Sequence, residues 1–157
     1  MPEYSFTVPG TPCPWQVFQR GGQRRNRSTG LWETASGYLA LHTWQAEIQR
    51  AAIEYWYQRG PRKPLTGLVY LRLEFYLPYP ASAPQHNEDA KRRWRLKHRG
   101  MRPDRTNYLK GFEDALQGIV YVNDSQVVDG PILKEYADGP EGYTVVWIQE
   151  LTEVTSQ

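Results

Sequence analysis

Residues 102–129 read RPDRTNYLKGFEDALQGIVYVNDSQVVD, and the strongest structural signals of the chain lie here. A proline followed by turn-prone polar residues predicts the beginning of a helix, with Thr106 or Asn107 as its N-terminal cap. Apolar side chains at three- and four-residue spacing then predict a short helix over about 108–116 with one buried face. The exposed face of this helix is therefore expected to carry polar residues.

The second half of this stretch predicts that the chain turns back beside the helix. Gly118 suits the left-handed backbone just past a helix end. We expect a brief strand over 119–122, a turn at Asn123-Asp124 and an extended segment over 126–128. Asp124 therefore stands at the end of a predicted strand.

Three residues of this stretch have the chemistry of a metal-dependent phosphodiesterase. Asp104 lies just before the predicted helix, Lys110 lies on it, and Asp124 follows the predicted strand. Magnesium prefers oxygen ligands and is usually held by one or two carboxylates together with substrate phosphates. It lowers the pKa of a bound water, and a nearby lysine can stabilise charge on the phosphate. By residue type alone, a helix cap and a solvated lysine are the commoner interpretation.

The order and spacing of these residues resemble the RusA family of Holliday-junction resolvases. That family carries P-D-x-D-N-x-x-K, then D-A-L-x-G, then D-D-x-Q-[IV] and a later lysine. The corresponding segments here are Pro103–Lys110, Asp114–Gly118 and Asn123–Val127, with Lys134 as the later lysine. The motifs are colinear over residues 102–134, and a weaker resemblance covers nearly the whole chain.

The resemblance implies roles for individual residues. Asp104 matches the first essential aspartate of the family, and Asp124 matches the aspartate at the later turn. Lys110 matches the catalytic lysine, and Asn107 matches the motif asparagine. Thr106 stands where the family usually has its second aspartate, so one neutral oxygen replaces a carboxylate.

The metal implied by the resemblance is Mg²⁺ or Mn²⁺, held by the two matched aspartates. Either the Thr106 hydroxyl or the carboxylate of a nearby acidic residue would complete the ligand shell. Glu113 is the first candidate, because it follows Thr106 by seven residues on the same helical face. Asp114 and Glu74 are the other candidates.

Length and periodicity predict one α+β domain over residues 1–157, with a mixed sheet, one long helix and one short helix. The long helix is expected over 35–59, where apolar residues recur at helical spacing. Strict alternation marks residues 68–77 as a strand with one buried face. Further strands are expected at residues 4–8, 132–136 and 143–151, the last of them central in the sheet.

Several classes of protein are excluded by simple features of the chain. No apolar run reaches the ~20 residues that span a bilayer, and no signal-peptide pattern is present. The single cysteine, Cys13, allows no intramolecular disulfide and no cysteine zinc cluster. No phosphate-binding loop of the Walker type occurs, and no acid-x-Lys triplet follows Pro103-Asp104 as the PD-(D/E)-x-K nucleases require. We therefore expect a cytoplasmic protein with no membrane and no nucleotide cofactor as partners.

The charges are strongly segregated along the chain. Residues 1–103 hold 16 Lys or Arg against 7 Asp or Glu, whereas residues 104–157 hold 3 against 10. Basic segments beside an acidic site suit a nuclease, because cations bind phosphates and carboxylates bind the metal.

Most of the positive charge falls in two segments predicted to be mobile basic loops, residues 11–34 and 78–101. We expect them to contact the DNA backbone, with Trp94 available to stack on an unpaired base. A solvated loop and a targeting signal are the respective alternatives. The expected DNA-binding residues are Arg24, Arg25, Arg27, Arg92, Arg93, Arg95, Lys97, Arg102 and Lys134.

The resemblance implies a metal-dependent endonuclease that resolves four-way DNA junctions by paired symmetric nicks, in DNA recombination and repair. A homodimer would supply two identical sites across a two-fold junction. One alternative is a non-catalytic protein that binds branched DNA, which Thr106 favours. Another is a nuclease of broader range that acts on flaps and other branched DNA.

Overall fold

The computed structural model describes residues 3–15, 23–34 and 36–152. Its centre is a five-stranded mixed sheet with three helices, which confirms the predicted α+β class. The sheet strands are β1 (Glu3–Pro9), β4 (Leu68–Leu77), β5 (Val127–Asp129), β6 (Ile132–Tyr136) and β7 (Tyr143–Leu151). The helices are α1 (Ser36–Gln58), α2 (Glu88–His98) and α3 (Arg105–Leu116).

Strand β7 lies between β1 and β4 and runs antiparallel to both, as its apolar character on both faces predicted. Val146 pairs with Phe6 of β1 on one side and with Leu73 of β4 on the other. Strand β4 then runs parallel to β5 and β6. Between these two strands Gly130 passes close to the backbone of Leu71, with a φ of 134° that favours glycine.

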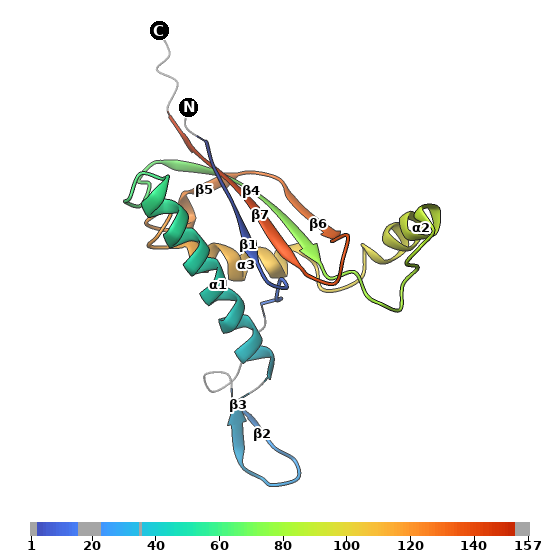
Figure 1. The fold of residues 1–157 in the computed structure, drawn as a ribbon. Coiled ribbons are helices and arrows are strands. Elements are labelled where there is room, and N and C mark those ends of the chain that lie inside the picture. Colours follow the sequence, from blue (N-terminus) through green and yellow to red (C-terminus); the bar gives the residue numbers. More distant parts are fainter. Residues whose placement is uncertain (1–2, 16–22, 35, 153–157) are drawn as a thin grey trace.

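Helices α1 and α3 cover one face of the sheet (Figure 1). Phe112 of α3 is fully buried between Trp44 of α1 and Phe75 of β4, with ring centroids 5.8 Å from each. Tyr108 meets the same Phe75 ring at 5.6 Å. Burying aromatic side chains of this size contributes about 1.5–3 kcal/mol each, so this cluster fixes how α3 lies on the sheet.

The opposite face of the sheet carries the polar residues of β4. Arg72 and Glu74 form an ion pair at 2.7 Å, and Glu74 also accepts a hydrogen bond from the Tyr76 hydroxyl. Arg72 lies over the ring of Trp147 on the neighbouring strand. Glu74 therefore lies on the face away from α3, because side chains alternate along a strand. This placement corrects the suggestion that Glu74 replaces the aspartate missing at Thr106.

Helix α3 begins earlier than predicted. It starts at Arg105, and Asp104 occupies the cap position with an extended backbone but no side-chain capping bond. Thr106 and Asn107 lie inside the first turn, so neither of them is the cap. Aspartate is itself a favoured residue at the cap position, which explains the earlier start.

The segment after α3 is a compact turn and not the expected strand. Gly118 has the predicted left-handed backbone, with φ 84°. Within 119–122, Tyr121 makes isolated bridges to Leu65 and Gln117. Val120 and Tyr121 are fully buried, so their apolar character serves the core and does not mark a strand.

The basic segment predicted as a mobile loop over 78–101 contains helix α2, which stands away from the sheet (Figure 1). Asn87 caps it by accepting a hydrogen bond from the backbone of Ala90 at 3.0 Å. Acidic residues occupy the first turn and basic residues the last turn, which complements the helix dipole.

The other basic segment, 11–34, contains a hairpin of β2 (Gln23–Arg25) and β3 (Trp32–Thr34) that projects beyond the beginning of α1 (Figure 1). Residues 16–22 of this segment lie outside the described residues. Among the helices that the structure describes, none is long and apolar enough to cross a membrane.

Candidate active site

The exposed face of α3 carries the predicted site. Tyr108, Phe112 and Leu116 are buried against the sheet and α1. Thr106, Lys110 and Glu113 follow one another at steps of four and three residues, so they share the opposite face.

The N-terminal end of α3 is surrounded by cations. Asp104 is exposed and lines a groove of about 400 Å³ with Arg99, Arg105 and Lys134. The ammonium group of Lys134 donates hydrogen bonds to the carbonyl oxygens of Met101, at 2.6 Å, and Pro103, at 2.9 Å. Lys134 thus fixes the segment that leads into Asp104. This internal role is additional to its predicted contact with DNA.

The C-terminal end of α3 is joined to the turn that carries Asp124. The backbone N–H of Asp124 donates to the side chain of Gln117, just past the helix end, at 3.2 Å. Asn123 and Gln126 form a capping box around the short 3-10 helix Asp124–Gln126. These bonds hold the Asp124 backbone beside the last turn of α3.

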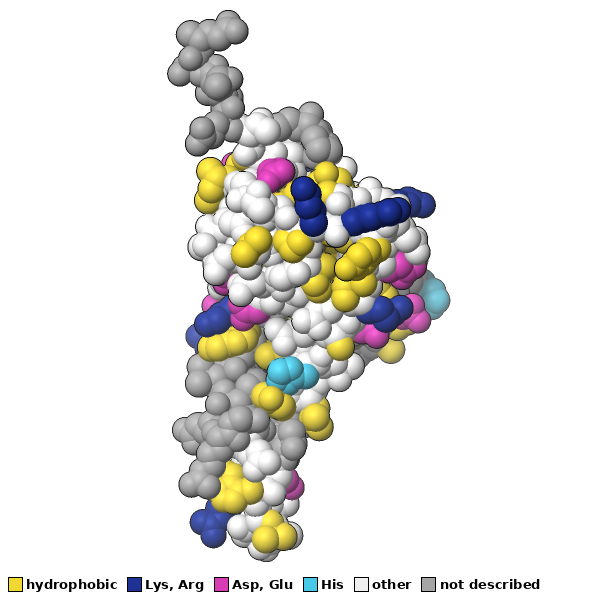
Figure 2. All heavy atoms as spheres, turned by 90° about the vertical axis from the view of Figure 1, so that its left-hand side faces the viewer, with side chains coloured by type: hydrophobic (Ala, Val, Ile, Leu, Met, Phe, Trp, Pro, Cys, Tyr) yellow, Lys and Arg dark blue, Asp and Glu magenta, His cyan; other side chains and the backbone are white. Residues whose placement is uncertain are grey.

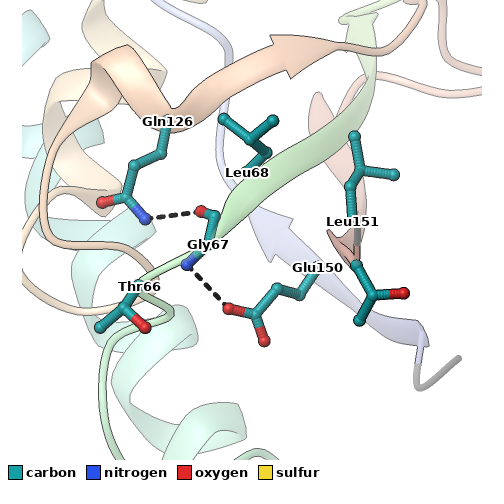
Figure 3. A pocket seen from close by; sticks show the side chains of 7 residues that line it. Thr66, Gly67, Leu68, Gln126, Glu150 and Leu151 are labelled. Carbon is teal, nitrogen blue, oxygen red and sulfur yellow. Dashed lines mark hydrogen bonds between the residues drawn. The ribbon is translucent and has the colours of Figure 1, made fainter. Parts of the chain in front are cut away.

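Gln126 also fixes this turn to the beginning of β4. Its side-chain amide donates to the carbonyl oxygen of Gly67 at 2.8 Å, while Glu150 accepts a bond from the Gly67 N–H at 2.9 Å. Figure 3 shows both side chains reaching the same glycine beside a cavity of about 620 Å³. The family-motif glutamine, to which no role was assigned from the sequence, is therefore a structural anchor for Asp124.

Three carboxylates lie close enough to affect one another at this end. Burial, followed by the negative charges of Asp124 and Asp114, raises the pKa of Glu113 to about 7. Burial and the charge of Asp124 also raise the pKa of Asp114, while Lys110 opposes that rise. The fold thus holds these carboxyl groups together at a free-energy cost when they are ionised.

This donor set fits a divalent cation in kind. Two carboxylates plus substrate phosphate oxygens and waters are a usual Mg²⁺ environment, and Glu113 and Asp124 could supply the carboxylates. A bound cation would neutralise their repulsion and activate a water. Within the part of the chain that the structure describes, no group of three or more His, Cys, Asp or Glu side chains is arranged to hold a metal ion.

The structure does not bring Asp104 into this carboxylate group. Asp104 precedes α3, whereas Asp124 is bonded to Gln117 at the other end. A helix rises 1.5 Å per residue, so the two ends lie roughly 20 Å apart. Lys110 lies between them. Its ammonium group is 3.8 Å from the ring centroid of Trp15, a contact across 95 residues that no local sequence pattern predicts.

The basic residues of α2 divide into two sets. Arg95 contacts the Tyr79 ring and Asp138 on the inner side of α2, so this predicted DNA-binding residue makes internal contacts. Trp94 is half-buried and packs against Tyr79 and Tyr136, so it anchors the helix, and its stacking on a base stays a prediction. Three further predicted DNA-binding residues, Arg92, Arg93 and Lys97, are exposed on the outer side.

In the hairpin, two of the three predicted arginines have partners within it. Arg24 forms an ion pair with Glu33 at 3.0 Å, and Arg25 donates to the carbonyl oxygen of Gly30 at 3.1 Å. Arg27 and Arg102 are exposed. Side chains of this kind can still offer further N–H groups to a phosphate, because a guanidinium has five donors.

Comparison with known proteins places this geometry in a family. The chain matches the family described as endodeoxyribonuclease RusA over residues 12–147, which is nearly its whole length. The chain belongs to the RusA family. Among curated proteins it is similar to the uncharacterized protein YqaN of Bacillus subtilis (strain 168), with 34% identity over 88 residues. That match covers 53% of this chain and 59% of the relative, which is less than two thirds of its length.

Glu113 offers a first test of the electrostatics at the C-terminal end of α3. Its pKa in the folded protein lies above the ordinary 4.5, so the folded state binds more protons than the unfolded state between pH 4.5 and 7. The contribution of Glu113 to the free energy of unfolding is fully present below pH 4.5 and is lost as the pH rises through 7. We expect Glu113→Gln to be more stable than the wild type at pH 8 by the order of 1–2 kcal/mol, allowing for partial exposure, and nearly equal at pH 4.5.

Urea denaturation at the two pH values measures this difference. The matched control is Glu141→Gln, the same change at an exposed turn position. An equal effect of Glu113→Gln at pH 4.5 and pH 8 would contradict the electrostatic account of this site.

Proposed function

We propose that this protein is a metal-dependent endonuclease that cuts four-way DNA junctions by paired symmetric nicks. The observation that carries the proposal is the arrangement of the RusA motif on α3. Lys110 lies on its exposed face, and carboxylates of raised pKa gather at one end. Strongly perturbed carboxylates beside a lysine are typical of catalytic sites.

We assign the carboxylates and the lysine complementary roles. Glu113 and Asp124 would hold Mg²⁺ or Mn²⁺, with Thr106 as a neutral oxygen on the same face. Lys110 would stabilise negative charge on the phosphate in the transition state. Asp104 and Asn107 keep the catalytic roles that the family motif implies, at the other end of the helix.

DNA would be held by cations outside the helix that carries the site. The outer side of α2 offers Arg92, Arg93 and Lys97, all exposed, on a helix that Trp94 anchors to the sheet domain. Such a row of cations can follow a phosphate backbone without reading its sequence. This arrangement suits recognition of a junction by its shape.

Two symmetric cuts require two sites, so we propose that the active form is a homodimer. The outward side of α1 supports this assignment, because it exposes Leu39, Ile53 and Tyr57 at 43–60% of their surface. Figure 2 shows hydrophobic side chains among charged ones on this side of the molecule. A second copy could cover these residues.

The first test is cleavage of a synthetic four-way junction beside a linear duplex, with Mg²⁺, Mn²⁺ or EDTA. We expect metal-dependent, paired nicks in the junction and little cutting of the duplex. Asp124→Asn and Lys110→Met should each slow cleavage at least ~100-fold, because each removes a group that acts on the reacting phosphate. Asp104→Asn should also abolish cleavage. All three variants should retain junction binding.

Two other outcomes would replace the proposal. Tight junction binding without cleavage under any metal would favour the non-catalytic branched-DNA-binding protein, and would mean that Thr106 cannot take the place of the family aspartate. Equal cutting of flaps, single strands and junctions would favour the nuclease of broader range.

The role of α2 has a separate signature in the salt dependence of binding. Each lost phosphate contact should reduce the slope of log K against log salt concentration by about 0.9 on duplex DNA. We therefore expect Arg92→Gln/Arg93→Gln to reduce the slope by about 2. The control Arg59→Gln/Lys63→Gln removes the same charge near the end of α1 and should change it far less. An equal reduction by both variants would mean that α2 is not the contact surface.

A further inference from the structure

The ammonium group of Lys110 lies directly over an aromatic ring contributed by a distant part of the chain. Its nitrogen is 3.8 Å from the ring centroid of Trp15, well within the ~6 Å over which a cation is attracted to an indole face. The family motif includes Lys110 but not Trp15, which lies in the segment after β1. The catalytic lysine therefore has a partner that its own motif does not contain.

Trp15 is itself fixed to the helix that carries Lys110. Its backbone N–H donates to the carbonyl oxygen of Asn107 at 2.8 Å, three residues before Lys110. The side chain is half-buried and packs against the hydrophobic core. The indole is thus held by the backbone on one side and by core contacts on the other, so it can act as a fixed support for a flexible side chain.

Lys110 has a second neighbour on the same helix. Asp114 follows it by four residues, and the charge of Lys110 lowers the pKa of that carboxyl against the effects of burial and Asp124. The ammonium group therefore lies over an aromatic face and within electrostatic range of an acid. A lysine side chain free in solvent samples many rotamers, and ordering it costs conformational entropy. The contact with the fixed indole of Trp15 orders Lys110 before DNA binds.

We propose that Trp15 is a positioning residue for Lys110, which holds its ammonium group at a fixed place on the exposed face of α3. This inference rests on the proposed nuclease function for its catalytic consequence, but not for its geometry. A preorganised cation stabilises a transition state without having to be reoriented during the reaction. The alternatives are that Trp15 only fills space, or that it stacks on an unpaired base of the junction.

The test compares Trp15→Phe, which keeps an aromatic face, with Trp15→Leu, which keeps an apolar side chain without one. In the free protein, NMR should find the terminal methylene protons of Lys110 shifted upfield by the indole. The shift should be reduced in Trp15→Phe and lost in Trp15→Leu. This measurement needs no DNA and no activity, so it stays decisive if the proposed function fails.

The kinetic arm measures single-turnover cleavage of a four-way junction at saturating protein. Trp15→Leu should cut between about threefold and thirtyfold more slowly, the range expected for one cation–π contact, with unchanged junction affinity. Trp15→Phe should recover most of the rate. In a Lys110→Met background, Trp15→Leu should cause no further loss, because the two residues act as one unit.

The control is Trp147→Leu, which removes a second tryptophan that lies under a cation among the described residues, Arg72 at 4.4 Å, on the opposite face of the sheet. It should leave both the chemical shift of the Lys110 terminal methylene protons and the cleavage rate unchanged. The absence of an upfield shift of the Lys110 terminal methylene protons in the wild type would overturn the proposal. So would equal losses in Trp15→Phe and Trp15→Leu, which indicate packing, or a loss confined to junction affinity, which indicates base stacking.

Discussion

The burial of one face of α3 is the constraint on which the rest of the structure depends. Phe112 is fully buried between Trp44 of α1 and Phe75 of β4, and this contact fixes the rotation of the helix about its own axis. Once that rotation is fixed, the helical period of 3.6 residues turns Lys110 outward and leaves Glu113 half-buried beside it. The family motif is therefore a packing pattern as well as a chemical one, because the same dozen residues supply both the core contact and the exposed polar face.

The electrostatics of this helix are unfavourable for a purely structural element. Glu113 and Asp114 lie in the last part of α3, where the helix dipole favours cations, and the last turn contains no basic residue. Burial and the neighbouring Asp124 raise the pKa of both carboxyls further. Free-energy costs of this kind persist at functional sites, where a ligand relieves them. Many basic residues of the first part of the chain lie on α2 and the hairpin, but Arg95 and Arg99 pair with Asp138 and Glu135 of the acidic part.

Local periodicity predicted the parts of the fold that depend on it, and tertiary contacts decided the rest. The bounds of β4 and β7 agree with the predicted strands because alternation reports burial directly. Helix α2 was missed because its anchoring depends on Trp94 meeting Tyr79 and Tyr136, which are distant in sequence. The support of Lys110 by Trp15 could not be predicted for the same reason. The motif located the residues of the candidate site, but only the fold separates Asp104 from the carboxylates around Asp124.

The central claim is that a divalent metal binds between Glu113 and Asp124 at the C-terminal end of α3. Carbon-13 NMR of the side-chain carboxyl groups during a Mg²⁺ titration tests it most directly, with signals assigned by Glu113→Gln, Asp124→Asn and Asp104→Asn. The account predicts saturable shifts of the Glu113 and Asp124 carboxyl carbons, with release of a proton from Glu113 near pH 7. Saturable shifts confined to Asp104, or uniform shifts without saturation, would contradict it.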